Sequence, residues 1–109
     1  MVDRKYLDTY ESKIRFRLGI HVKVTEHARN AIRDDGYEMD DIMKSMNNFK
    51  IIERYDDARP FPACLLLCKM RGKVIHVVCG LPEHADMLII VTVYIPSDKN
   101  WSNYATRRK

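Results

Sequence analysis

The chain has 109 residues, 46% of them hydrophobic and 31% charged, with a formal net charge of +4 at pH 7. This balance is typical of one globular domain, and it permits an anionic partner without specifying one. The longest apolar runs, 63–68 and 87–91, are far shorter than the roughly 20 residues of a membrane span, and the N-terminal "MVDRKYLDTYESK" has no apolar signal region. We therefore expect a single cytoplasmic domain over residues 1–109, with no membrane partner.

An apolar stripe predicts a helix near the N-terminus, over about residues 3–18. Its hydrophobic residues recur at three- and four-residue steps: Tyr6, Leu7, Tyr10, Ile14 and Leu18. Gly19 ends the pattern, as glycine commonly does after a helix. The other face is basic and includes Arg15 and Arg17, so residues 1–19 are interpreted as a basic N-terminal helix.

Two further helices are predicted before the chain changes character. Thr25 can cap a helix that has Glu26 in its first turn and stops near Gly36. This helix would place His27 within one turn of its start. Methionine and isoleucine at helical spacing predict a third helix over about residues 39–47.

From residue 50 onward the pattern is that of strands. Branched and aromatic residues are concentrated in "KIIERY", "ACLLLCKM", "KVIHVVCG" and "MLIIVTVYI", and "DDARPFP" is a loop between the first two. Helices followed by strands predict an α+β fold, with two to three N-terminal helices packed on one face of a roughly four-stranded antiparallel sheet. Residues 20–95 would form this core. Residues 96–109 would be a polar, basic tail with Trp101 and Tyr104 as anchors.

The sequence "MRGK" predicts a tight hairpin turn that determines the register of two strands. Met70 then pairs with Lys73, Leu67 with His76, and Cys64 with Cys79. Because side chains alternate between faces, these two strands have one wholly apolar face, where we expect the helices, and one mixed face. His76 belongs to the mixed face, where we expect it to look toward solvent.

Two polar residues of the last strand are expected to join His76. Strict alternation puts Thr92 and Tyr94 on one side of that strand, together with Leu88 and Ile90. The run "ERY" contributes residues from the other end of the sheet. The expected polar patch consists of His76, Thr92, Tyr94 and one or two of Glu53, Arg54 and Tyr55.

Imidazole, phenol and carboxylate groups on an open sheet surface can cleave RNA without a metal or cofactor. A base takes the ribose 2′-OH proton, an acid protonates the leaving oxygen, and a cation stabilises charge on the phosphate. Core packing of His76 and local bonding of His27 at its helix start are the alternative interpretations. We interpret the candidate catalytic residues as His27, His76, Tyr94 and Glu53. The candidate substrate-binding residues are Arg15, Arg17, Arg29, Arg33, Tyr55 and Thr92.

The three cysteines, Cys64, Cys68 and Cys79, all lie in apolar runs, which is typical of reduced core thiols. Cys64 and Cys79 face each other in the predicted hairpin, but their spacing lacks the second close Cys/His pair of a structural zinc site. No phosphate-binding glycine loop or nucleophile elbow is present, which argues against a nucleotide-dependent enzyme or a serine hydrolase.

Four sequence elements between about Val24 and Trp101 resemble the prokaryotic family called domain of unknown function 4258. They are "TEHARNAIRDDGYEMDDI", "IIERY", "VIHVVCG" and "IIVTVYIPSDKNW". The resemblance implies the toxin half of a toxin–antitoxin pair, with a small zinc-finger antitoxin as partner. The order of elements also resembles RelE-like ribonucleases, which by analogy implies RNA cleavage. Matching by position, the motif polar residues are His27, Glu53, Tyr55, His76, Thr92 and Tyr94.

The chain departs from this family pattern at two positions of the second helix. Ala31 and Asp35 stand where arginines are common, and Arg29 and Arg33 are the substitutes that the sequence offers. Two alternatives to a ribonuclease therefore stay open. One is a non-catalytic domain that binds a protein or nucleic acid. The other is a metalloprotein that uses Cys64, Cys79 and a histidine.

Overall fold

The computed structural model describes residues 10–96, 101–102 and 106–107. The first half of the predicted N-terminal helix lies outside these residues, as do the side chains of the two expected tail anchors, Trp101 and Tyr104. The described helices are α1 (Tyr10–Leu18), α2 (Glu26–Asp34), α3 (Met39–Ser45) and the short 3-10 helix η2 (Met46–Asn48). None of the described helices is long and apolar enough to cross a membrane.

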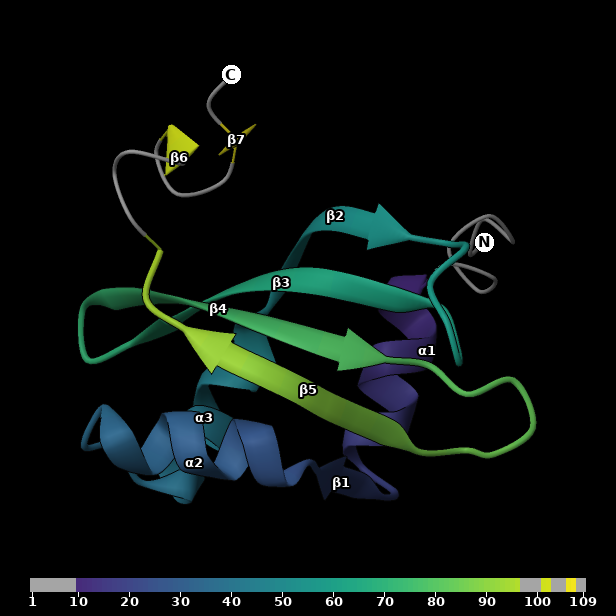
Figure 1. The fold of residues 1–109 in the computed structure, drawn as a ribbon, viewed down its shortest axis with the longest axis horizontal. Helices are drawn as coiled ribbons and strands as arrows, with labels where there is room; N and C mark the ends of the chain where they lie inside the picture. The colour runs from purple at the N-terminus through teal and green to yellow at the C-terminus, as the bar shows by residue number, and fades with distance from the viewer. Residues whose placement is uncertain (1–9, 97–100, 103–105, 108–109) are drawn as a thin grey trace, which may run out of the picture.

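The main sheet has five strands in the order β1-β5-β4-β3-β2, which Figure 1 shows face on. A separate two-stranded pair, β6 with β7, follows near the C-terminus. The bounds of all seven strands are β1 (Val22–Val24), β2 (Lys50–Tyr55), β3 (Ala63–Met70), β4 (Lys73–Gly80), β5 (Leu88–Tyr94), β6 (Trp101–Ser102) and β7 (Thr106–Arg107).

The predicted α+β class is confirmed, with one strand more than expected in the main sheet. β2, β3, β4 and β5 are antiparallel neighbours, as predicted, whereas β1 pairs in parallel with β5. From the sequence, the segment "HVKV" around β1 is predicted to be only a short extended link. It becomes a strand because the chain passes beside β5, where the Leu88 backbone N–H donates to the His21 carbonyl and the Thr25 N–H donates to the Ile90 carbonyl. The sheet is therefore mixed.

The predicted hairpin turn and its register are confirmed. Arg71 and Gly72 have φ angles of 51° and 80°, the positive values that a two-residue hairpin turn of type I′ requires. Leu67 is paired with His76 and Cys64 with Cys79. Because side chains alternate, this register determines which residues of β3 and β4 share a face.

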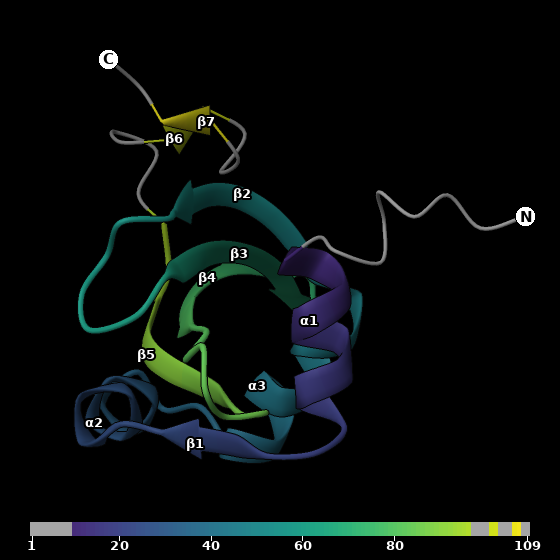
Figure 2. The ribbon, with the colours of Figure 1, turned by 90° about the vertical axis from the view of Figure 1, so that its right-hand side faces the viewer.

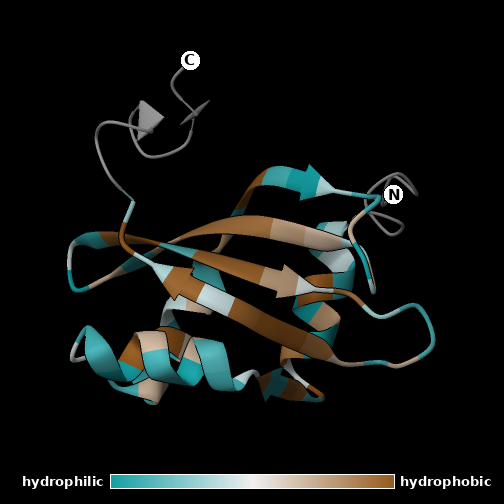
Figure 3. Ribbon diagram, in the orientation of Figure 1, coloured by the Kyte–Doolittle hydropathy of each residue, from teal (hydrophilic) through white to brown (hydrophobic). Residues whose placement is uncertain are grey.

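The helices pack on one face of the curved sheet. Figure 2 shows β2 to β5 in an arc, with α1 and α3 on its inner side, and Figure 3 shows how strongly hydrophobic the strands are. Ile14 of α1, Ile32 of α2 and Ile42 of α3 join one buried cluster with the apolar strand face. The residues that the hairpin contributes to this face are Cys64, Leu66, Cys68, Met70, Ile75, Val77 and Cys79.

The prediction for β5 was wrong for the first half of the strand, because the strand contains a β-bulge. Val78 is paired with Thr92 and Cys79 with Ile90, which leaves Val91 as an extra residue. The bulge reverses the alternation, so Leu88 and Ile90 lie in the helix-side core. Thr92 and Tyr94 remain on the opposite face, as expected. We call this opposite face of β2 to β5 the outer face.

Candidate functional site

His76 and Tyr94 are paired residues on β4 and β5, and both lie on the outer face. His76 Nδ1 lies 3.3 Å from the Tyr94 hydroxyl oxygen, within hydrogen-bonding distance. The two rings meet edge to face, with centroids 5.2 Å apart and planes at 72°. When Nε2 carries the imidazole proton, Nδ1 accepts the hydrogen bond from the phenol. The pair can therefore pass a proton between a buried base and a phenol.

The expectation that His76 faces solvent was wrong. Its side chain is 0% exposed, although it lies on the face away from the helices. His76 lies on the central strand β4, between Leu67 on β3 and Tyr94 on β5. Tyr94 is only half-buried. A ligand on the outer face would therefore meet the phenol of Tyr94 rather than the imidazole.

The paired residues form rows that cross the outer face. One row runs Lys50, Leu67, His76, Tyr94 from β2 to β5. A second, parallel row runs Glu53, Leu65, Val78, Thr92. The predicted polar residues thus share one face. Glu53 is two strands across and two residues along from His76. Since adjacent strands are about 4.8 Å apart and each residue adds about 3.3 Å along a strand, the two residues are roughly 12 Å apart in the sheet plane.

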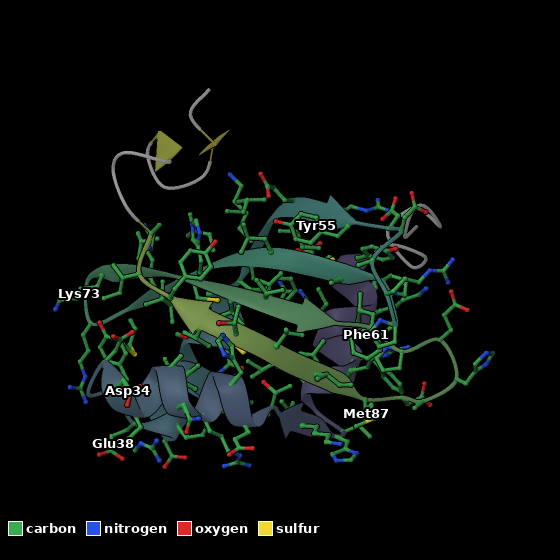
Figure 4. All side chains as sticks on the ribbon, in the orientation of Figure 1. Asp34, Glu38, Tyr55, Phe61, Lys73 and Met87 are labelled. Carbon is green, nitrogen blue, oxygen red and sulfur yellow. The ribbon has the colours of Figure 1, made fainter. Side chains whose placement is uncertain are left out.

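Glu53 and Tyr55 form a second polar pair on the outer face. The Tyr55 hydroxyl donates a short hydrogen bond of 2.5 Å to Glu53 Oε1, and both residues are half-buried. Tyr55 is paired with Ala63, at the opposite end of the sheet from Tyr94, and Figure 4 shows its ring on β2. The predicted site is therefore two separate phenol pairs. Arg54, the third residue of this run, lies on the helix side and stacks on Tyr10, 4.1 Å from its ring centroid.

His27 is exposed in the first turn of α2. The preceding Thr25 caps this helix by accepting a hydrogen bond from the Ala28 N–H. Its hydroxyl also donates to the carbonyl of Val91, the extra residue of the β5 bulge. The start of α2 is thereby attached to the strand that carries Thr92 and Tyr94. His27 is the one predicted imidazole that solvent can reach.

The α1 arginines are occupied on the helix side of the sheet. Arg17 is only 7% exposed and donates a 3.1 Å hydrogen bond to the Met87 carbonyl, which leaves little of its guanidinium accessible to a substrate phosphate. Arg15 is exposed, but it pairs with Glu11 at 3.3 Å and lies 4.8 Å from the ring centroid of Phe49.

The α2 arginines are exposed. Arg33 donates a 2.8 Å hydrogen bond to Asn30 Oδ1, and Asp35 ends the helix with its backbone N–H bonded to the Ala31 carbonyl.

Lys50 and Lys69 belong to the outer face and were missed as candidate site residues. Lys50 is in the same row as His76, and Lys69 follows Leu67 by two residues on β3. Both side chains are exposed. The predicted hairpin register already put Lys69 on the face of His76. Lys50 could not be placed in the same way, because the alignment of β2 depends on a bulge between Ile51 and Glu53.

The three thiols are buried in the helix-side core and are free, as predicted. Burial raises the pKa of Cys64 to about 11 and that of Cys68 to about 12, and it also raises the pKa of Cys79. The thiols are therefore protonated at neutral pH, whereas thiolates bind metals and act as nucleophiles. In the described part of the chain, no three His, Cys, Asp or Glu side chains gather in a metal-binding arrangement.

A hollow lies at the far end of the sheet, between the β2–β3 and β4–β5 loops. Its volume is about 560 Å³, and Asp57, Arg59, Phe61 and Glu83 are among its lining residues. Phe61, labelled in Figure 4, closes over the backbone of Gly80. None of the predicted site residues lines this hollow.

A curved mixed sheet with helices on one face and a histidine–tyrosine pair on the other defines a small α+β domain. The chain belongs to the family described as Domain of unknown function (DUF4258), whose model matches residues 24–95. The match begins in β1 and ends directly after β5, so it includes the outer face and excludes α1. No curated protein and no solved structure matches the chain. The resemblance to RelE-like ribonucleases stays a prediction.

Proposed function

We propose that the protein is an endoribonuclease that needs no metal and acts through the outer face of its sheet. The observation that carries the proposal is the contact between the half-buried Tyr94 and the buried His76. A buried imidazole can hold a proton that it exchanges with the phenol, and the phenol can reach a substrate. In this arrangement Tyr94 is the catalytic residue, and His76 is a positioning residue that acts through it.

The proposed cleavage is an attack of the ribose 2′-oxygen on the adjacent phosphorus. Tyr94 takes the 2′-OH proton while its own phenol proton passes to His76 Nδ1. The new bond joins the 2′-oxygen to phosphorus, and the bond from phosphorus to the 5′-oxygen breaks. His27 is exposed in the first turn of α2, whose capping residue Thr25 bonds to the Val91 carbonyl of β5, and it is the candidate acid that protonates the leaving 5′-oxygen. The products are a 2′,3′-cyclic phosphate and a 5′-hydroxyl end.

The biological setting that we propose, which the sequence resemblance implies, is the toxin half of a toxin–antitoxin pair in the cytoplasm. The partner would be a small zinc-finger antitoxin that inhibits cleavage. Arg29 and Arg33 would contribute cations from α2, and Thr92 and the Glu53–Tyr55 pair would contact more distant parts of the RNA.

The test is RNA cleavage by the purified protein in the presence of EDTA. We expect single-stranded RNA to be cut with cyclic phosphate ends, and we expect Tyr94→Phe to reduce the rate by about 100-fold or more while the protein stays folded. Tyr37→Phe is the matched control, because this tyrosine follows α2 and packs against the helix-side core. Intact RNA at high protein concentration, or equal cleavage by Tyr94→Phe, would contradict the proposal.

A second candidate function is a non-catalytic domain that binds nucleic acid or protein. The observation in its favour is the complete burial of His76, which is what a structural histidine shows. It predicts RNA or protein binding without turnover and no change in binding on Tyr94→Phe. The same cleavage assay, run beside a binding assay, separates the two functions.

A further inference from the structure

The two exposed lysines of the outer face, Lys50 on β2 and Lys69 on β3, lie close together on the same face as the His76–Tyr94 pair. Lys50 on β2 is paired with Leu67 on β3, and Lys69 lies two residues after Leu67 on β3. Diagonal neighbours of this kind have their Cα atoms about 7–8 Å apart, within the joint reach of two lysine side chains. The row of Lys50 continues through His76 to Tyr94. Since adjacent strands are about 4.8 Å apart, Lys50 lies roughly 10 Å from His76 and roughly 14 Å from Tyr94 along this row.

These lysines differ from the arginines of α1 in the partners that they have. Arg15 is paired with Glu11, and Arg17 is buried against Met87. Neither Lys50 nor Lys69 takes part in an ion pair among the described residues. The carboxylate of the outer face that is nearest along β2, Glu53, is bonded to Tyr55. The lysines can thus neutralise an external anion.

The outer face also offers surface for bases. Tyr94 on β5 is an aromatic residue that is half-buried, and Val74, opposite Lys69, is also half-buried. Val74 lines a hollow of about 290 Å³ together with Lys73, Ile95 and Pro96. Sheets that carry aromatic side chains bind unpaired bases by stacking, and this needs a single strand whose bases are free.

We propose that Lys50 and Lys69 bind phosphates of a single-stranded RNA that lies across the outer face, and that they place its backbone at Tyr94. This inference rests on the proposed function for the identity of the ligand. It assigns the binding surface to the sheet and not to the basic helix α1. Because lysine neutralises phosphate without reading bases, the binding has no sequence preference from these two residues.

The test is binding of a fluorescent single-stranded RNA to the Tyr94→Phe protein in EDTA, measured by anisotropy over a range of salt concentrations. The Tyr94→Phe background prevents cleavage from consuming the probe. We expect Lys50→Gln and Lys69→Gln each to weaken binding about three- to tenfold and to reduce the slope of log affinity against log salt by about 0.7. Lys44→Gln, exposed on α3 at the helix side, is the matched control and should bind like its parent.

The outcomes separate this inference from the proposed function. Weaker binding by both lysine variants supports the surface even if the wild-type protein leaves RNA intact. Unchanged binding by both variants overturns it even if the wild-type protein cleaves RNA. Weakening by Arg15→Gln in place of the lysine variants also overturns it, because α1 would then be the RNA-binding element. Absence of RNA binding at low salt overturns it as well.

Discussion

The Tyr94 hydroxyl lies 3.3 Å from His76 Nδ1, and the two residues are directly paired on adjacent strands. The contact links a side chain that is 0% exposed to one that is half-buried. An isolated buried imidazole costs free energy unless its nitrogen atoms have partners. Tyr94 satisfies one of them and at the same time connects the imidazole to the protein surface.

Removal of this hydroxyl should lower stability as well as activity. We expect Tyr94→Phe to lower the free energy of unfolding by about 1–2 kcal/mol, because the ring contact stays and the hydrogen bond to His76 is lost. Urea denaturation followed by circular dichroism measures the change. Tyr37→Phe is the control. An equal loss of stability in the control would show that the Tyr94 hydroxyl has no special role.

The two α1 arginines should differ in their contributions to stability. Arg17→Met removes a buried guanidinium from the Met87 carbonyl, so we expect a loss of about 1.5–3 kcal/mol. Arg15→Met removes an exposed ion pair and a cation–π contact, which we expect to contribute about 1 kcal/mol or less. Thermal and urea unfolding of the two variants give the comparison. Similar losses of unfolding free energy in the two variants would argue against a buried hydrogen bond between Arg17 and the Met87 carbonyl.

The loop that leads into β3 depends on the absence of a side chain at Gly80. An added Cβ would lie 2.0 Å from Cε1 of Phe61, far inside van der Waals contact. We expect Gly80→Ala to lower the free energy of unfolding by about 1–3 kcal/mol. Gly19→Ala is the control, because its Cβ would meet only the Phe16 carbonyl oxygen at 3.6 Å.

A double-mutant cycle isolates the Gly80 clash. Phe61→Ala removes the ring that the new Cβ would strike, so the double variant should lose at least about 0.5 kcal/mol less than the sum of the single variants. Simple additivity of the two losses would contradict the packing of Phe61 on Gly80.

The buried thiols should make stability fall at alkaline pH. Burial raises the pKa of Cys68 from 9.0 to about 12, and a hydrogen bond with Ser45 opposes part of this effect. Below pH 9 both folded and unfolded chains keep the proton, so the full stability is present. Above pH 9 the unfolded chain loses the proton first, and the free energy of unfolding falls by up to about 1.4 kcal/mol per pH unit.

Comparison with Cys68→Ala isolates this effect from other titrating groups. The stability difference between the wild-type protein and Cys68→Ala should narrow as the pH rises from about 8 to about 10.5 under reducing conditions. Denaturant unfolding at a series of pH values measures it. A difference that stays constant with pH would mean that the Cys68 thiol ionises equally in both states.

Much of the fold was predictable from local patterns. Helical spacing predicted three helices, and Tyr10, Ile14 and Leu18 do face the core. The turn at Arg71 and Gly72 determines the β3–β4 register, which correctly predicted the pairing of His76 with Leu67. These features depend on residues close together in the chain, where backbone angles and side-chain alternation act directly.

The candidate site was predictable only in part. The shared face of His76, Thr92 and Tyr94 followed from alternation, but the distance between this group and the Glu53–Tyr55 pair did not. The hydrogen bond from Arg17 to the Met87 carbonyl could not be predicted, because the two residues are 70 positions apart in the chain. The position of Lys50 beside Lys69 could not be predicted either, because it depends on how β2 aligns with β3.

The α+β class, the hairpin register and the membership of His76 in the outer face follow from local periodicity and turn chemistry, and could be predicted from the chain alone. Three features depend on contacts between distant segments: β1 adds a parallel strand, Val91 forms a bulge which returns Leu88 and Ile90 to the core, and His76 is fully buried. These outcomes depend on which distant segments meet and on how closely side chains from neighbouring strands cover one another, and no local pattern encodes either quantity.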